Sequence, residues 1–380
     1  MREVADVVIV GGGAAGCSVA YHLARAGVRS TIIEGAGIGS QASGFSAGGL
    51  NPLQGAGIPG PLGPFGMESY LLHRELAGIL KADTGIDYEW RIISLVKAAF
   101  DEADFPELQG TVDVFTEADG FEADWLDREE LLKLEPRVAP DVLCGVRAWG
   151  NASLDSYKYT LALVQAAEKL GVSVRSGTVR GLEGSSGRMT RVLLEDGVVS
   201  CGQVVLAMGP WSRQAEPWLD LYIPVDPLKG EILRLELPSG PLAHDFLGGG
   251  GSFYPKPDGL VWSGVTEDWR GFDRETSESA RRRIVDSAVR LMPDVAQARL
   301  VLHTACLRPV TPDWLPIIGR APGWENVYLA TGASKKGILL SPAIGKAVAD
   351  LIAQGDTQLP IGIFGPERFV GPRGWGELVV

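Results

Sequence analysis

Three glycines near the start of the chain have the spacing of a nucleotide-binding loop. Gly11, Gly13 and Gly16 fit the pattern G-x-G-x-x-G. In this pattern the first glycine makes a tight turn, the second lets the backbone approach a pyrophosphate, and the third lets a helix sit close to the preceding strand. Glu34 follows about 20 residues later, where a carboxylate accepts a hydrogen bond from a ribose hydroxyl and repels a ribose phosphate. These residue types predict a dinucleotide site that disfavours NADP.

The elements around this loop have the order that such a site needs. The apolar run Val7–Val10 predicts a buried strand, Cys17–Ala26 a helix and Ser30–Glu34 a second strand. The helix N-terminus would present N–H groups and the positive end of its dipole to phosphates. An ordinary strand–turn–helix corner without a ligand is the alternative. The succession of strand, loop, helix, strand and acid favours the nucleotide site.

Length and composition describe a globular chain of more than one domain. Its 380 residues exceed the usual size of a single core. The net charge of −12 argues against a nucleic-acid or anionic-membrane partner. No apolar run is long enough to span a bilayer, and the first predicted strand begins too early for a signal peptide. The four cysteines are scattered and form no C-x-x-C pair, so we expect no metal site, no disulfide framework and a cytoplasmic location.

A stretch rich in Gly, Ser and Pro, residues 35–66, follows the second predicted strand. Long loops inside compact domains are usually functional. The small residues and hydroxyl groups of this one would let a flat ligand and its phosphates approach the backbone closely. A flexible linker is the alternative.

The rest of the chain alternates between α/β and β-rich stretches. Val204–Ala207 predicts a buried strand that leads into a turn at Gly209, a second edge of the nucleotide site. Residues 223–303 show alternating strand patterns interrupted by one helix, which predicts an antiparallel sheet in a domain that covers the substrate. A strand, a glycine-bounded loop over 332–337 and a helix from Ile338 then restore the α/β character.

Together these motifs resemble the D-amino-acid oxidase superfamily of FAD enzymes, nearest its glycine oxidase and sarcosine oxidase branch. Five stretches carry the resemblance, in the family's order: Val7–Gly16 with Glu34, Ser43–Gly49, Val204–Ser212, Leu307–Gly319 and Thr331–Pro342. The resemblance implies an α/β fold in two domains. A Rossmann-like FAD-binding domain would comprise 1–85 with 145–215 and 305–365. A substrate domain with an antiparallel β-sheet and flanking helices would comprise 86–144 with 216–304.

The resemblance also implies FAD as the cofactor and assigns residues to its parts. Glu34 would hold the adenosine ribose, and Val179 would lie by the adenine. The glycine loop, with Ala14 and Ala15, would lie by the pyrophosphate. The ribityl and flavin side would be lined by Ser43, Ala47, Gly48 and Gly49. Further cofactor contacts would come from two later loops: Gly209, Trp211, Gly332, Lys336, Gly337, Ile338 and Leu339.

On the substrate side, the resemblance implies a cation for a carboxylate. Arg308 matches the arginine that grips the substrate carboxylate in the glycine oxidase pattern. An arginine in a structural ion pair is the alternative. Lys335 stands where glycine oxidase has an arginine, and a solvated surface lysine is an equal alternative.

Three positions depart from the family pattern. Ser252 stands where the relatives place a pocket tyrosine, and Tyr254 would share its face of a strand, so we expect a wider pocket. Glu267 falls at an apolar pocket position; pointing inward it would favour a substrate with a second amine, and a loop carboxylate in water is the alternative. Trp262 replaces a lysine that aids the reaction of sarcosine oxidase with oxygen, which puts oxidase behaviour in question.

Cys306 precedes Arg308 by two residues, so both would face the same way on a strand. Sarcosine oxidase carries a flavin-linked cysteine at the matching place, whereas glycine oxidase has glycine there and binds FAD without a covalent bond. A covalent tether to FAD and a small buried thiol are the two interpretations.

The implied reaction is oxidation of the C–N bond of a small amino acid or N-alkyl amino acid. Hydride transfer to the flavin would give an imine that water hydrolyses, and oxygen as the acceptor would give hydrogen peroxide. A dehydrogenase with another acceptor is one alternative. A flavin-binding subunit of a larger assembly, without catalysis of its own, is the other.

Overall fold

The computed structural model describes residues 3–370, which form two compact units. Among them, unit 1 comprises residues 3–38, 163–226 and 309–370, and unit 2 comprises 39–162 and 227–308. The chain passes between the units after Ile38, Ala162, Asp226 and Arg308. The predicted domain bounds put residues 39–85 and 145–162 with the nucleotide-binding part, whereas here they belong to unit 2. The assignment of cofactor and substrate roles to the two parts stays a prediction.

Unit 1 contains eight strands and three helices of the α type. The strands are β1 (Glu3–Val10), β2 (Ser30–Glu34), β9 (Ser173–Ser176), β10 (Val179–Ser185), β11 (Arg188–Leu194), β12 (Gly197–Leu206), β18 (Ile317–Arg320) and β19 (Val327–Thr331). The helices are α1 (Ala14–Arg25), α7 (Glu216–Leu219) and α9 (Gly337–Ala353), and α6 (Ser156–Lys169) runs across the junction between the units.

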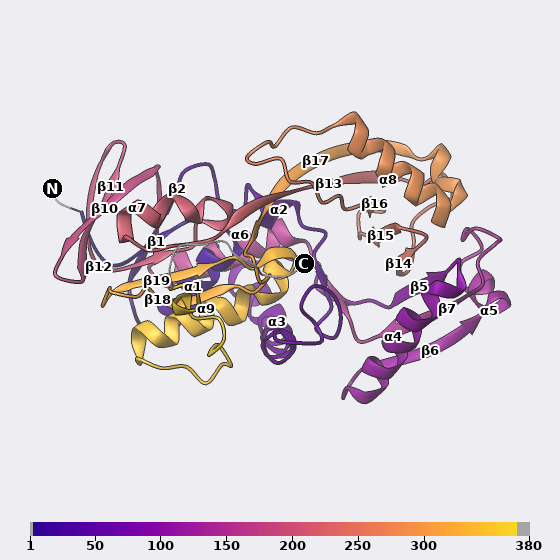
Figure 1. Ribbon diagram of the computed structural model, residues 1–380, viewed down its shortest axis with the longest axis horizontal. Helices are drawn as coiled ribbons and strands as arrows, with labels where there is room; N and C mark the ends of the chain where they lie inside the picture. Colours follow the sequence, from indigo (N-terminus) through magenta and orange to yellow (C-terminus); the bar gives the residue numbers. More distant parts are fainter. Residues whose placement is uncertain (1–2, 371–380) are drawn as a thin grey trace. The chain divides into compact units, whose positions relative to one another are not determined.

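The sheet of unit 1 is Rossmann-like at its centre. Strands β9, β2, β1, β12 and β19 lie side by side and run parallel. In this register Val8 pairs with both Thr31 and Val204. The first part of β12 instead pairs antiparallel with β11, and the turn between them lies just before Gly197. Helices α1 and α9 pack against each other beside this sheet (Figure 1).

Burial explains why the first strand forms where its apolar run predicts. Val8 and Ile9 are fully buried, and the strand is covered on both faces, as parallel strands usually are. A core of branched side chains from β1, β12 and β19 holds the sheet together. The predicted strand, helix and second strand at the start of the chain are confirmed.

Unit 2 contains two sheets and their covering helices. Its first part holds α2 (Ala42–Phe45), β3 (Gly49–Leu50), α3 (Gly63–Thr84), β4 (Arg91–Ile92), β5 (Leu95–Ala99), α4 (Phe105–Glu117), β6 (Glu122–Asp127), α5 (Arg128–Leu134), β7 (Cys144–Trp149) and β8 (Ala152–Ser153). Its second part holds β14 (Asp245–Gly248), β15 (Gly251–Pro255), β16 (Val261–Ser263) and α8 (Glu278–Leu291). Strands β13 (Asp226–Glu236) and β17 (Arg299–Val310) run through junctions between the units.

The large sheet of unit 2 has the order β17-β13-β16-β15-β14-β5-β7-β6. The sequence predicts an antiparallel sheet, and this is correct for the pairs from β13 to β14 and from β5 to β6. It is wrong at one place, since β14 and β5 run parallel. That pair joins strands from distant parts of the chain, which local alternation cannot orient.

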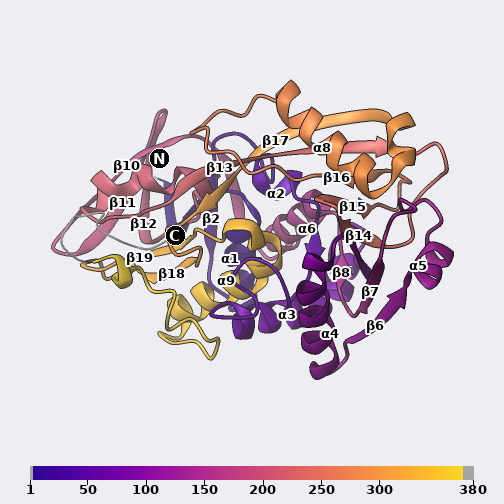
Figure 2. The same cartoon turned by 45° about the vertical axis from the view of Figure 1, so that its right-hand side comes forward.

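One face of this sheet packs against α8 around Phe246, Phe253 and Ile284, all buried. Helix α8 packs on β15, and Figure 2 shows α4 beside β6 and β7. Helix α5 begins with a capping box, in which Asp127 and Glu130 exchange hydrogen bonds. In the part of the chain that the structure describes, no helix has both the length and the apolar character to cross a membrane.

Candidate functional site

The predicted cofactor residues of unit 1 gather at one edge of its sheet. Strands β2, β1, β12 and β19 are parallel neighbours, so their carboxyl ends meet at the same edge. The residues at or just after these ends are Glu34, Gly11, Gly209 and Gly332. In open α/β sheets, ligands bind outside this edge.

The glycine loop has no space for side chains at its two ends. Gly11 has a φ of +112°, and a Cβ atom there would lie 2.3 Å from the carbonyl oxygen of Ala207. A Cβ atom on Gly16 would lie 2.0 Å from the carbonyl oxygen of Gly11. Helix α1 begins at Ala14 and no side chain caps it at Gly13. The start of α1 therefore lies directly against the strand end and offers backbone groups to a ligand.

The carboxylate of Glu34 accepts a hydrogen bond from this loop. Its Oε2 accepts a hydrogen bond from the backbone N–H of Gly12 at 2.6 Å, and its Oε1 accepts from Ala36 at 2.7 Å. The backbone N–H of Gly177 donates to the carbonyl of Glu34 at 3.0 Å, and the chain then runs directly into Val179. The predicted ribose and adenine positions thus lie near each other along the end of β2.

The later loops of unit 1 are joined by hydroxyl groups. Ser212 and Thr331 share a hydrogen bond of 2.6 Å, and the hydroxyl groups of both donate to the carbonyl of Gly209. This arrangement fixes the turn after β12, which carries Trp211, to the end of β19. A Cβ atom on Gly332 would lie 2.7 Å from a methyl group of Thr311, so that turn is also close-packed.

Two residues in this region have strained backbone conformations. Ser334 has a φ of +49° and Trp314 a φ of +61°, and the Ser334 hydroxyl donates to the Trp314 carbonyl at 3.3 Å. Left-handed conformations of residues other than glycine often mark functional loops. The sequence does not reveal this strain.

The two lysines of this loop differ in their surroundings. Lys335 is exposed and its Nζ lies 5.1 Å from the centre of the Trp314 ring, a cation–π contact. Burial lowers the pKa of Lys336 to about 8. Helix α9 starts at Gly337 without a side-chain cap, and Ile338 and Leu339 are buried. Lys336 is therefore the more deeply placed cation of the pair.

In unit 2, three of the predicted flavin-side residues lie in the segment 46–49, which leads into β3 and which we name the cradle turn: Ala47, Gly48 and Gly49. Its members are fixed to β8 and the start of α6: the backbone N–H of Leu154 donates to the Gly48 carbonyl at 3.0 Å, and the Ser156 hydroxyl donates to the Ser46 carbonyl at 2.8 Å. Ser43 lies just before this turn, in α2. The turn is thus an ordered part of the unit, which argues against a flexible linker.

Arg308 lies flat over a glycine. A Cβ atom on Gly230 would lie 2.3 to 2.5 Å from three guanidinium atoms of Arg308. Its Nη1 donates to the Thr266 carbonyl at 3.2 Å. Among the described residues, no acid forms an ion pair with Arg308, and the side chain is partly exposed. The guanidinium is therefore available to a carboxylate, which favours the predicted role over a structural ion pair.

Ser252 and Tyr254 share a face of β15, as their spacing predicts, because Phe253 between them is buried in the core. The Ser252 hydroxyl donates to the Gly264 carbonyl, so it is fixed to the neighbouring strand. Burial raises the pKa of the Tyr254 hydroxyl, and this group feels the charge of Arg308. Through the pairs Tyr254–Trp262 and Trp262–Arg234, Tyr254 lies on the same face of the sheet as Gly230, which Arg308 covers.

Trp262 of β16 lies opposite Tyr254 of β15 and opposite Arg234 of β13 in the register of the sheet. The Arg234 guanidinium lies 4.0 Å from the Trp262 ring centre, and the Nζ of Lys256 lies 5.3 Å from it. Two cations therefore flank this indole. The sequence analysis missed Arg234 and Lys256, although alternation along β15 would place residue 256 on the face of residues 252 and 254.

Two other predicted residues are placed as follows. The side chain of Glu267 is exposed next to buried Thr266, which favours a loop carboxylate over a pocket residue.

Cys306 is an unpaired thiol on β17. Burial raises the pKa of this thiol, which disfavours the thiolate needed for a covalent bond to FAD. The covalent tether stays a prediction.

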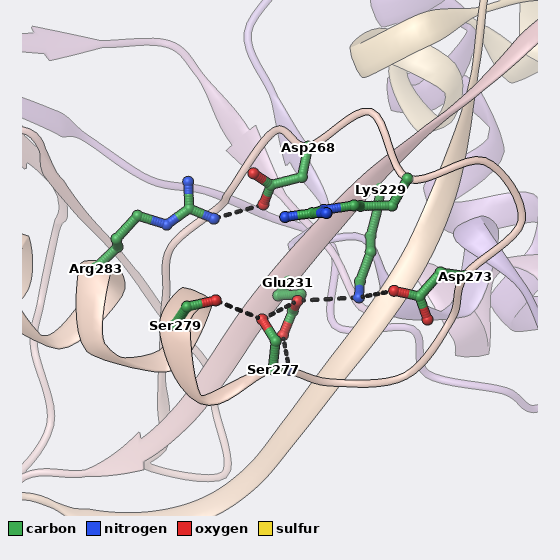
Figure 3. Close-up of a pocket in the computed structure, with 8 residues that line it drawn as sticks. Lys229, Glu231, Asp268, Asp273, Ser277, Ser279 and Arg283 are labelled. Carbon is green, nitrogen blue, oxygen red and sulfur yellow. Dashed lines mark hydrogen bonds and ion pairs between the residues drawn. The ribbon is translucent and has the colours of Figure 1, made fainter.

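A polar cavity of about 160 Å³ lies against β13 (Figure 3). Gly230 meets the Arg308 guanidinium, so the residues on either side of it face away from Arg308. Lys229 and Glu231 alternate with Gly230 along the strand and point into the cavity. Lys229 is paired with Asp273 at 2.8 Å, and Glu231 accepts from the Ser277 N–H at 2.8 Å and its hydroxyl at 2.9 Å. These pairs join the segment of Asp273 and Ser277 to β13.

The comparisons with known proteins agree with this geometry. Residues 6–351 match the family model described as FAD dependent oxidoreductase. The chain belongs to this family. It is therefore an FAD-dependent oxidoreductase, and the predicted superfamily, α/β fold class and cofactor are confirmed.

Relatives of known activity cover nearly the whole chain. It is 31% identical to a glycine oxidase of Geobacillus kaustophilus over 375 residues, which cover 97% of this chain and 98% of that protein. A glycine oxidase of Pseudomonas putida is 28% identical and covers 96% of this chain and 99% of its own. The crystal structure of the Geobacillus kaustophilus glycine oxidase matches with a TM-score of 0.91 at 29% identity, over 97% of this chain and 100% of that one.

Proposed function

We propose that this FAD-dependent amino acid oxidoreductase oxidises the C–N bond of glycine or of a similarly small primary or N-alkyl amino acid. One observation carries the proposal. The guanidinium of Arg308 lies over Gly230 and donates to the Thr266 carbonyl, and no acid in the described part of the chain pairs with it. The glycine oxidase relatives support a small amino acid as the substrate.

In this proposal each described residue has a limited task. Arg308 binds the substrate carboxylate through two parallel N–H groups. The Thr266 carbonyl accepts a hydrogen bond from Nη1 and so fixes the position of the guanidinium. Tyr254 lines the same face and limits the space for a side chain on the substrate. When bound, FAD supplies the acceptor for the hydride from the α-carbon. Glu34, the glycine loop and the start of α1 would hold its adenosine and pyrophosphate.

We propose oxygen as the electron acceptor, since the relatives are named oxidases. The dehydrogenase alternative rests on Trp262, which is flanked by two cations. The alternative of a flavin-binding subunit without catalysis does not explain why the Arg308 guanidinium pairs with no acid among residues 3–370.

The test is an anaerobic titration of the yellow holoprotein with single amines, followed in the visible flavin spectrum. Glycine, sarcosine, D-alanine and D-proline form the panel, and propionate is the control without an amine. We expect glycine or sarcosine to bleach the flavin and air to restore its colour with release of hydrogen peroxide. A holoprotein that no member bleaches would overturn the proposal, and slow recovery in air with fast recovery by an artificial acceptor would identify a dehydrogenase.

A further inference from the structure

Lys256 is a buried lysine that the proposed reaction does not use. It follows β15 directly and is 8% exposed. Its backbone N–H is bonded to Leu260, which fixes the start of the side chain. A buried ammonium group is costly unless its N–H groups find partners, so its contacts carry information.

The ammonium group of Lys256 donates to three neutral acceptors. These are the carbonyl of Ala47, the carbonyl of Leu154 at 3.3 Å and the hydroxyl of Ser153 at 3.3 Å. An ammonium group has three N–H groups, and these acceptors account for all of them. The acceptors belong to the cradle turn and to the segment that holds this turn.

The cradle turn and the segment of Ser153 and Leu154 also contact each other, and Lys256 binds to both. Gly49 pairs with Ser153 as β3 and β8, and Leu154 donates to the Gly48 carbonyl. Without the ammonium group, the carbonyls of Ala47 and Leu154 would lose a charged donor in a place that water hardly reaches. The cradle turn would then lose the contact that orients the peptide after Ala47.

The surroundings keep this charge in place. The Trp262 ring lies 5.3 Å from Nζ, and the buried carboxylate of Asp245 is close enough to interact with the ammonium group. Burial lowers the pKa of Lys256 and raises the pKa of Asp245, while their mutual attraction opposes both shifts. Asp245 is 6% exposed, so both charges lie inside the unit.

We propose that Lys256 is a positioning residue that holds the cradle turn in its FAD-binding conformation through the carbonyls of Ala47 and Leu154. The inference rests on the proposed cofactor role of this turn. It assigns Lys256 to binding of the flavin side of FAD, and it does not make Lys256 a group that touches the substrate.

The experiment measures FAD affinity in the apoprotein by quenching of flavin fluorescence. Lys256→Met keeps the length of the side chain and removes the ammonium group. Lys97→Met is the matched control, because Lys97 is also 8% exposed on the same sheet but pairs with Glu107 at 2.7 Å. We expect K256M to bind FAD about 10- to 100-fold more weakly than the wild type, and K97M to bind within about twofold.

A rescue experiment separates the ammonium contacts from a general loss of packing. Lys256→Ala leaves a space that n-propylammonium can fill with its own N–H donors. We expect n-propylammonium to tighten FAD binding by K256A several-fold and n-propanol to leave it unchanged. FAD binding by K256M within twofold of wild type, or equal rescue by propanol, would overturn the inference alone. A wild-type apoprotein that does not bind FAD would overturn the proposed function as well.

Discussion

In unit 1 the candidate ligand groups are backbone amides and one carboxylate at the carboxyl edge of a parallel sheet. In unit 2 the candidate site depends on charged side chains on the face of a mostly antiparallel sheet: Arg308, proposed to bind the substrate, and Lys256, proposed to position the cradle turn. The first arrangement depends on the absence of side chains at Gly11 and Gly16. The second depends on charges such as Arg308 and Lys256, held by carbonyl groups. Steric changes should therefore damage unit 1 most, and charge changes should damage unit 2 most.

The largest effect should follow a side chain at Gly16. Gly16→Val would place a Cβ atom 2.0 Å from the Gly11 carbonyl and push α1 away from the strand end. We expect FAD affinity to fall by at least about 100-fold in an apoprotein titration. Gly78→Ala is the control, because no atom lies within 4 Å of its Cβ position. Wild-type affinity in G16V would contradict the importance of this close approach.

The next effect tests the charge-based part of the comparison. Arg308→Met should lower kcat/KM for the amino acid by about 100-fold, mainly through KM, because a charge-assisted pair with the carboxylate is lost. FAD affinity should be unchanged. Arg299→Met on the same strand is the control, since Arg299 is exposed and pairs with Glu236. An unchanged KM in R308M would remove Arg308 from the substrate site.

A charge change in unit 1 should have a smaller effect than a steric one. Glu34→Gln keeps the size of the side chain but replaces one acceptor oxygen with an NH₂ group that faces a backbone N–H. We expect FAD affinity to fall by about 10-fold. Asp6→Asn, at an exposed pair with Arg29, should leave it unchanged. If E34Q lost as much FAD affinity as G16V, unit 1 would be as sensitive to charge changes as to steric ones, and the contrast with unit 2 would not hold.

The smallest effect concerns acid stability. Burial lowers the pKa of His22 in α1 to about 4, with further lowering by Lys346, and its Nε2 has no hydrogen-bond partner among the described residues. In the unfolded chain His22 takes up a proton near pH 6.5, whereas in the folded protein it does so only near pH 4. The free energy of unfolding therefore keeps its full value above pH 6.5 and decreases as the pH falls toward 4. The loss should be about 1–3 kcal/mol, and His22→Gln should remove it in urea titrations at pH 7.5 and 4.5. An equal loss in H22Q would assign the acid sensitivity to other groups.

The parts that the sequence predicts well are those with a local cause. The apolar run before Gly11 and the glycine spacing are local patterns, and the strand, the turn and the helix lie where they predict. The parallel pairing of β14 with β5 joins residues about 150 positions apart, and neither strand encodes its direction. The domain bounds differ for a similar reason, because residues 39–85 join unit 2 through contacts that no local pattern specifies.

The candidate site shows the same division. The motif residues of unit 1 meet at one sheet edge because parallel neighbours end together. Lys256 was missed because its importance comes from three acceptors more than 100 and 200 residues away in the chain. The strain at Trp314 and Ser334 was also invisible, since both residue types normally adopt negative φ.

The repeated passage of the chain between the units has a consequence for synthesis. Unit 2 has all its residues once Arg308 has been made, whereas the sheet of unit 1 still lacks β18, β19 and the covering helix α9. Strand β12 can pair with β19 only after more than 100 further residues have been synthesised, because Val204 pairs with Val327. On the ribosome, the parallel edge of the unit 1 sheet therefore stays open while unit 2 is already translated, and a truncated product would expose that edge to neighbouring chains.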